Sequence, residues 1–111
     1  MVFAEGGYNT RLEAIADPEI PAGRMIWMFD DTDMARAKQI VGARQAIGGN
    51  VPGSLLTMGT PERVDAYVKD LLGKTATNGG FLLGTGIVLD EADPACFKAF
   101  IDAGRSYGAE V

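Results

Sequence analysis

Short apolar runs and helical repeats of apolar residues alternate along this chain. Met25–Phe29 is an uninterrupted apolar run with acidic residues immediately after it, and Phe81–Leu83 runs directly into a Gly-x-Gly turn. Short runs of this kind are typical of strands that are buried in a parallel sheet. Together with two less apolar segments, they predict four strands at Val2–Glu5, Met25–Phe29, Ala43–Gly48 and Phe81–Gly84.

Four helices are predicted between and after these strands, over residues 11–16, 33–41, 60–73 and 93–108. The third begins with Thr60-Pro61-Glu62, which combines a hydroxyl cap, a proline and an acid in the first turn. The second is capped by Thr32 or Asp33. The order of strand, short helix, strand, helix, strand, helix, strand, helix predicts a parallel α/β protein. The chemistry of such a protein lies at the carboxyl ends of its strands.

The size and composition of the chain fit one globular domain. It has 111 residues, of which 47% are hydrophobic. No apolar stretch approaches the roughly 20 residues that a membrane span needs, and the first residues lack the pattern of a secretory signal. The single cysteine excludes an internal disulfide framework. We therefore expect a cytoplasmic protein with no membrane partner.

Charge and residue types exclude several kinds of site. The net charge is −5, and the 10 basic residues are dispersed, so a nucleic-acid partner is not expected. The chain has no histidine, which is the commonest general acid–base residue and the commonest metal ligand. Cys96 is the only thiol and is interpreted as a packing residue. No metal or cofactor is therefore expected within this chain.

Polar side chains and glycines at the strand ends are the candidate site residues. Glu5, at the end of the first strand, is a general base, a group that binds a cationic part of a ligand, or a solvated turn carboxylate, and Asp30 directly follows the second strand. The Asn50 amide either binds a ligand or locks its own loop. Thr85 is either a site residue or a polar turn residue that bonds to local backbone. The candidate catalytic residues are Glu5, Asp30 and Thr85, and the candidate substrate-binding residues are Gly49, Asn50, Gly84 and Gly86.

Four segments resemble the uroporphyrinogen decarboxylase superfamily, which includes the heme-pathway decarboxylase and the cobalamin-dependent methyltransferases. They are VFAEGG, WMFDDTDMARAKQIVG, GGNVPGSLLTMGTPERVDAYVKDLL and GGFLLGTGIVLDEADPACFKAFIDAGRSYG. The resemblance covers nearly the whole chain. Its more specific parts are the turn at Gly49–Pro52 and the glycine-flanked final strand. The family's fold is a (β/α)8 barrel of about 250 residues. The resemblance therefore implies a partial TIM barrel, a half-barrel made of the four C-terminal βα units.

The resemblance also implies a lyase or methyltransferase type of barrel that lacks complete catalytic machinery. The similar decarboxylases carry a histidine where this chain has Thr85, and a threonine hydroxyl does not carry protons near pH 7. The methyltransferases use zinc held by histidine and cysteine, whereas the matching positions here are Phe3, Glu5 and Ile87. A tetrapyrrole or a corrinoid is the ligand class that the resemblance implies.

A half-barrel has two open strand edges, here Val2–Glu5 and Phe81–Leu83. Open apolar edges pair with other strands, so we expect a homodimer in which two half-barrels close one another, or pairing with an N-terminal half. Two other functions remain open at this point. One is a non-catalytic binding or structural module, and the other is a small standalone α/β regulator whose likeness is architectural only.

Overall fold

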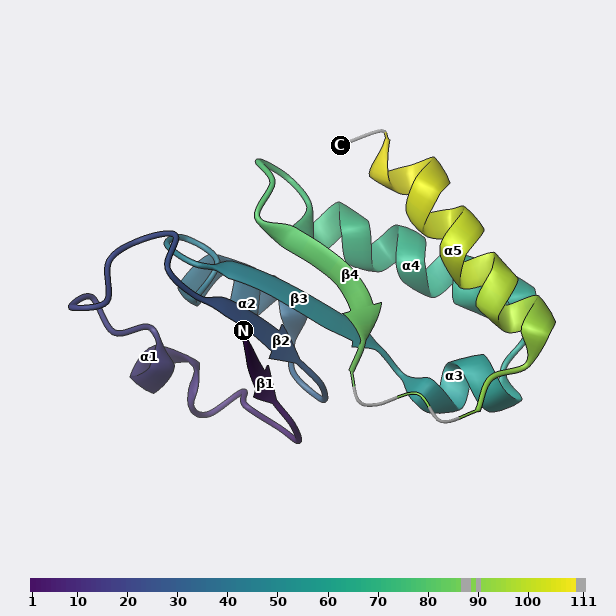
Figure 1. Cartoon of the computed structure of the whole chain (residues 1–111), viewed down its shortest axis with the longest axis horizontal. Coiled ribbons are helices and arrows are strands. Elements are labelled where there is room, and N and C mark those ends of the chain that lie inside the picture. The colour runs from purple at the N-terminus through teal and green to yellow at the C-terminus, as the bar shows by residue number, and fades with distance from the viewer. Residues whose placement is uncertain (87–88, 90, 110–111) are drawn as a thin grey trace.

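Four parallel strands form the sheet of this protein, in the order in which they occur along the chain (Figure 1). The computed structural model describes residues 1–86, 89 and 91–109. The strands are β1 (Val2–Ala4), β2 (Ile26–Phe29), β3 (Ala46–Val51) and β4 (Phe81–Thr85). Each neighbouring pair is parallel. The predicted α/β class and partial barrel architecture are confirmed, and β1 and β4 form the two open edges.

Five helices accompany the sheet within the described residues. They are α1 (Leu12–Ile15), α2 (Met34–Ile40), α3 (Gly53–Met58), α4 (Pro61–Thr75) and α5 (Pro94–Gly108). The three longest helices begin at side-chain caps, because Asp33, Thr60 and Asp93 each accept a hydrogen bond from a backbone N–H of the first turn. These caps confirm the predicted helix starts, with Asp33 rather than Thr32 as the cap of α2.

The hydrophobic core lies between the sheet and the helices on one of its faces. Phe29, Ile47 and Val51 contribute fully buried side chains from the strands, and Val64 and Val68 contribute them from α4. In Figure 1, α2 and α4 lie behind the sheet, and α5 packs against α4. Within the part of the chain that the structure describes, helices therefore cover one face of the sheet and not the other.

The opposite face of the sheet carries exposed apolar side chains. The strand register aligns Phe3 with Met28, Met28 with Gly48, and Gly48 with Leu82, which places these four residues on one face. Phe3 is 73% exposed and Leu82 is 40% exposed. In a closed βα barrel this face would point inward and be packed, so an open half-barrel leaves it uncovered.

Three local predictions were wrong. The third strand spans Ala46–Val51 rather than Ala43–Gly48: it begins later because the N–H groups of Arg44 and Gln45 donate to the Val41 carbonyl in a turn, and it continues through Gly49 and Asn50, which pair with β4. The helix predicted to stop at Gly73 continues to Thr75, whose buried hydroxyl donates to the Leu71 carbonyl. Helix α3 was not predicted, because its six residues bury only Leu56 and carry no side-chain cap. No helix within the described residues has the length and hydrophobicity to cross a membrane.

Candidate functional site

A hollow of about 520 Å³ lies on the open face of the sheet, at the carboxyl ends of β1, β2 and β4. Its apolar wall includes Phe3 and Met28, and its rim includes Glu5 and Thr85. The described residues that line it are Phe3, Glu5, Met28, Gly84, Thr85, Gly86 and Leu89. Four of the seven predicted site residues, Glu5, Gly84, Thr85 and Gly86, therefore lie together around one hollow.

Asp30 links two of the strand ends at this rim. Its Oδ2 accepts a hydrogen bond of 3.0 Å from the backbone N–H of Gly6, which follows β1. Its Oδ1 faces the turn after β4, where a Cβ added to Gly86 would lie only 2.5 Å from that oxygen. The absence of a side chain at Gly86 therefore lets the β4 turn approach the Asp30 carboxylate. Asp30 is half-buried, whereas Glu5 is exposed to solvent.

Asn50 lies on the other side of the sheet, toward the helices. Its Nδ2 donates to the backbone carbonyls of Asp30 at 2.7 Å and Thr32 at 3.1 Å. Its Oδ1 accepts a hydrogen bond of 3.0 Å from the hydroxyl of Tyr67 on α4. The side chain is 8% exposed and lines a separate hollow of about 240 Å³. Of the two interpretations offered by the sequence, the geometry matches the one in which the amide locks its own loop.

Gly49 precedes Asn50 in a conformation that favours glycine. Its φ is +113°, and an added Cβ would press against the backbone carbonyl of Phe29 on β2. The requirement for glycine here comes from the close approach of two neighbouring strands. Gly49 is buried and does not line the hollow on the open face.

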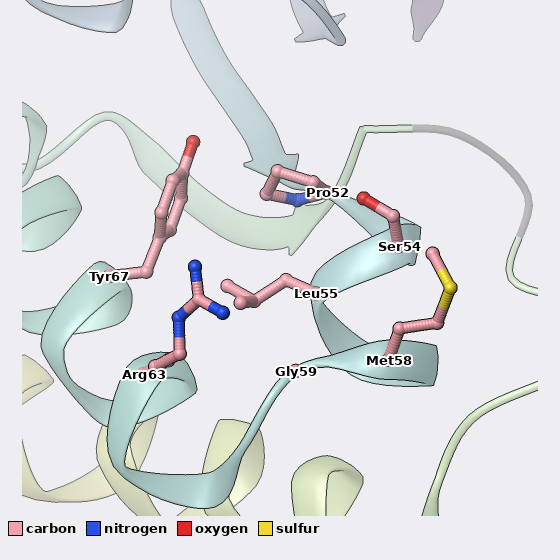
Figure 2. Close-up of a pocket in the computed structure, with 7 residues that line it drawn as sticks. All are labelled: Pro52, Ser54, Leu55, Met58, Gly59, Arg63 and Tyr67. Carbon is pink, nitrogen blue, oxygen red and sulfur yellow. The ribbon is translucent and has the colours of Figure 1, made fainter.

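A further hollow of about 330 Å³ lies between α3 and α4. Figure 2 shows the Arg63 guanidinium pointing into the gap between Tyr67 and Leu55, with Met58 at the outer side. Burial raises the pKa of the Tyr67 hydroxyl above its ordinary value, although the nearby Lys74 ammonium acts in the opposite direction. The helical spacing of Tyr67 with the buried Val64 and Val68 indicates only a residue that faces the core, and it gives no signal of the hydrogen bond to Asn50.

Cys96 belongs to the core and not to a site. Its side chain is fully buried on α5, and its Sγ lies 3.5 Å from the backbone oxygen of Gly59. Burial raises the pKa of the thiol, and a hydrogen bond with Asp93 acts in the same direction. A buried thiol held in its protonated form is a poor nucleophile.

The residues at the hollow do not fit the zinc site of the similar methyltransferases. Phe3 carries no ligand atom, and Ile87 lies outside the described residues. Among the residues that the structure describes, no group of three or more histidine, cysteine, aspartate or glutamate side chains is placed to hold a metal ion.

Comparison with known proteins shows to which family this chain belongs. The model of the uroporphyrinogen decarboxylase (URO-D) family matches residues 1–107. Uroporphyrinogen decarboxylase of Psychromonas ingrahamii is 42% identical over 94 residues, which are 83% of this chain and 25% of that protein. The same-named proteins of Cellvibrio japonicus and Actinobacillus pleuropneumoniae are 37% and 34% identical, over 99% and 98% of this chain and 30% of each relative. The chain thus spans less than a third of the length of these relatives, and it belongs to the uroporphyrinogen decarboxylase family.

Proposed function

We propose that this chain forms one wall of a uroporphyrinogen-decarboxylase-type cavity that binds a tetrapyrrole or related ring. We further propose that the chain lacks the complete catalytic machinery for decarboxylation. The observation that carries the proposal is the hollow on the open face, where apolar side chains adjoin Glu5 and Thr85 and where the Asp30 carboxylate lies close to the lining residue Gly86. Flat apolar rings with polar edges fit sites of this composition.

The apolar wall suits the face of a pyrrole ring. Phe3 and Met28 come from neighbouring strands in aligned positions, so their side chains lie next to each other on the same face. Aromatic and thioether groups both pack favourably against aromatic rings. The volume of about 520 Å³ is within the usual range for a small-molecule site.

The carboxylates at and near the rim favour some chemical groups of a ligand over others. Carboxylates accept hydrogen bonds, so Glu5 and Asp30 suit the N–H groups of pyrroles and disfavour acidic ring substituents. The described residues that line the hollow include no lysine or arginine. A ligand with several carboxylate substituents therefore needs cations from outside this lining.

Proton transfer is the step that this chain is least equipped to support. Loss of CO₂ from an acidic ring substituent leaves a carbanion, which must receive a proton. The similar decarboxylases offer an imidazole in the turn where this chain has Thr85, and imidazole is suited to that transfer near pH 7. We infer that the wall binds a ring without completing the reaction.

Porphyrin binding tests the proposal. Titration with uroporphyrin and with the less acidic coproporphyrin, followed by the shift of porphyrin absorbance and by quenching of the single tryptophan, Trp27, measures the dissociation constants. We expect tighter binding of coproporphyrin and at least about tenfold weaker binding by Met28→Ala, because one apolar contact of this size contributes about 1–3 kcal/mol. Met58→Ala is the matched control, since Met58 is 78% exposed and lines a different hollow.

A decarboxylation assay with uroporphyrinogen completes the test. We expect no product above the uncatalysed rate. Product formation would overturn the proposed lack of catalytic machinery, and equal loss of porphyrin binding in the Met28 and Met58 variants would overturn the proposed binding wall. Thermal unfolding of each variant distinguishes lost binding from lost folding.

A further inference from the structure

The hollow between α3 and α4 is built from one short stretch of the chain. Its volume is about 330 Å³, and the described residues that line it all lie between positions 52 and 67. None of them belongs to β1 or β4, and none lines the hollow on the open face of the sheet. The walls of this second hollow are therefore independent of the sheet edges and of the proposed tetrapyrrole wall.

Arg63 supplies a positive charge to this hollow. Figure 2 shows its guanidinium between the side chains of Tyr67 and Leu55. Among the residues that the structure describes, no carboxylate forms a salt bridge with this guanidinium. The neighbouring hollow of about 240 Å³ differs in this respect, because its cation, Lys74, is paired with Asp70 at 2.7 Å. The N–H groups of the Arg63 guanidinium are thus available to an external anion.

The acidic residues closest to Arg63 along α4 do not neutralise it. Glu62 and Asp65 are one and two positions away, and side chains at these spacings on a helix do not face each other. Asp65 instead accepts a hydrogen bond of 2.8 Å from the hydroxyl of Tyr107 on α5. The positive charge in the hollow is therefore local, although the net charge of the chain is −5.

The walls around the guanidinium are largely apolar. Leu55 contributes an apolar side chain from α3, and Met58 lies at the outer side of the hollow. Tyr67 contributes an aromatic side chain from α4, but its hydroxyl proton is already donated to Oδ1 of Asn50 at 3.0 Å. Arg63 is thus the main donor that a ligand meets. A ligand that matches this lining has one anionic group and an apolar body.

From this arrangement we propose that the hollow between α3 and α4 binds a small monocarboxylate with an apolar body, whose carboxylate pairs with Arg63. A planar guanidinium binds a carboxylate through two parallel hydrogen bonds, which gives the pairing its specificity. The volume of about 330 Å³ is at the lower end of the range for small-molecule sites. It suits a single ring or a short chain rather than a tetrapyrrole, so this site does not depend on the proposed function.

Titration of the whole chain with benzoate, followed by two-dimensional amide NMR, tests the proposal. We expect saturable shifts at the amides of Leu55, Gly59 and Arg63, with a dissociation constant of about 1 mM or lower. Benzamide has the ring without the charge, and acetate has the charge without the ring. Each should bind at least about tenfold more weakly than benzoate, because each lacks one of the two contributions.

Substitutions separate the charge of Arg63 from its hydrogen-bonding geometry. Arg63→Met should weaken benzoate binding at least about tenfold, because it removes the charged donor. Arg63→Lys should weaken it less, because it keeps the charge but loses the planar pair of donors. Arg105→Met is the matched control, since Arg105 is an exposed arginine on α5 that does not line this hollow, and it should leave benzoate binding unchanged. Arg63 is exposed as well, so all three variants should stay folded in thermal unfolding.

Several outcomes would overturn the proposal. Equal affinity for benzamide would show that the charge is not recognised, and equal affinity for acetate would show that Arg63 attracts anions without help from the hollow. Shifts confined to Phe3, Glu5 and Thr85 would place the ligand in the hollow on the open face instead. Unsaturated binding throughout the millimolar range, or an equal loss in Arg105→Met and Arg63→Met, would also contradict a site at Arg63.

Discussion

Replacement of Asn50 by alanine tests whether the amide holds the end of β3 in place. The change removes two hydrogen bonds that Nδ2 donates to backbone carbonyls, at 2.7 and 3.1 Å, and one that Oδ1 accepts from Tyr67 at 3.0 Å. Each such bond contributes about 0.5–1.5 kcal/mol, and a buried partner left without a bond adds to the cost. We therefore expect a loss of about 2–4 kcal/mol in the free energy of unfolding.

This loss is large for a chain of this length. Domains have about 0.05–0.15 kcal/mol of stability per residue, so a loss of about 3 kcal/mol removes a substantial fraction of the total. Tyr67→Phe removes only the hydroxyl and should cost about 1 kcal/mol. Because the two side chains share a hydrogen bond, the double variant should be more stable than the sum of the two single losses predicts.

Urea unfolding followed by Trp27 fluorescence measures these differences at one fixed protein concentration. Asn9→Ala is the matched control, because Asn9 is exposed and its side chain accepts one hydrogen bond, from the N–H of Asp33 at 2.7 Å. We expect the control to lose less than about 1 kcal/mol. A loss below about 0.5 kcal/mol for Asn50→Ala, together with weaker porphyrin binding, would refute the reasoning and indicate that the amide binds a ligand.

Two further predictions concern glycine positions and alkaline pH. Gly49→Ala should lower the free energy of unfolding in urea by about 2–4 kcal/mol, because the φ of Gly49 is +113° and the new methyl would press on the Phe29 carbonyl. Gly73→Ala should raise it by about 0.5–1 kcal/mol, because Gly73 lies in a helix with open space for a Cβ. If Gly73→Ala were the less stable of the two variants, this explanation would be contradicted. Burial raises the pKa of both Tyr67 and Cys96. At alkaline pH the folded chain therefore retains protons that the unfolded chain has released. The free energy of unfolding should thus fall as the pH rises from about 8 to about 11. Cys96→Ala should flatten the part of this fall nearest pH 9, and an unchanged slope would show that the thiol does not contribute.

The elements were predictable where their signals are local. Asp33, Thr60 and Asp93 each lie next to the backbone groups that they cap, so three or four residues of sequence contain the whole interaction. The start of β3 was not predictable in this way. The segment before it is held by the Gln45 side chain, which accepts hydrogen bonds from the N–H groups of Arg24 and Met25, 21 and 20 residues earlier in the chain.

The candidate site was predicted only in part, for a related reason. The sequence correctly indicated which strand ends carry polar residues, and Glu5 and Thr85 lie around one hollow. It did not indicate that Asn50 turns toward α4, because the partner of its Oδ1, Tyr67, is 17 residues away. Sequence spacing alone does not show on which side of a sheet such a side chain lies.

Sequence by itself determined the alternation of strands and helices, the helix caps and the family, because each depends on residue type and short spacing. Tertiary structure alone decided that the Asp30 carboxylate accepts a hydrogen bond from Gly6 and lies close to Gly86. It also decided that Phe3 remains exposed on an uncovered face. The physical reason is that strand register and the coverage of a sheet are set by contacts between segments that lie far apart in the chain.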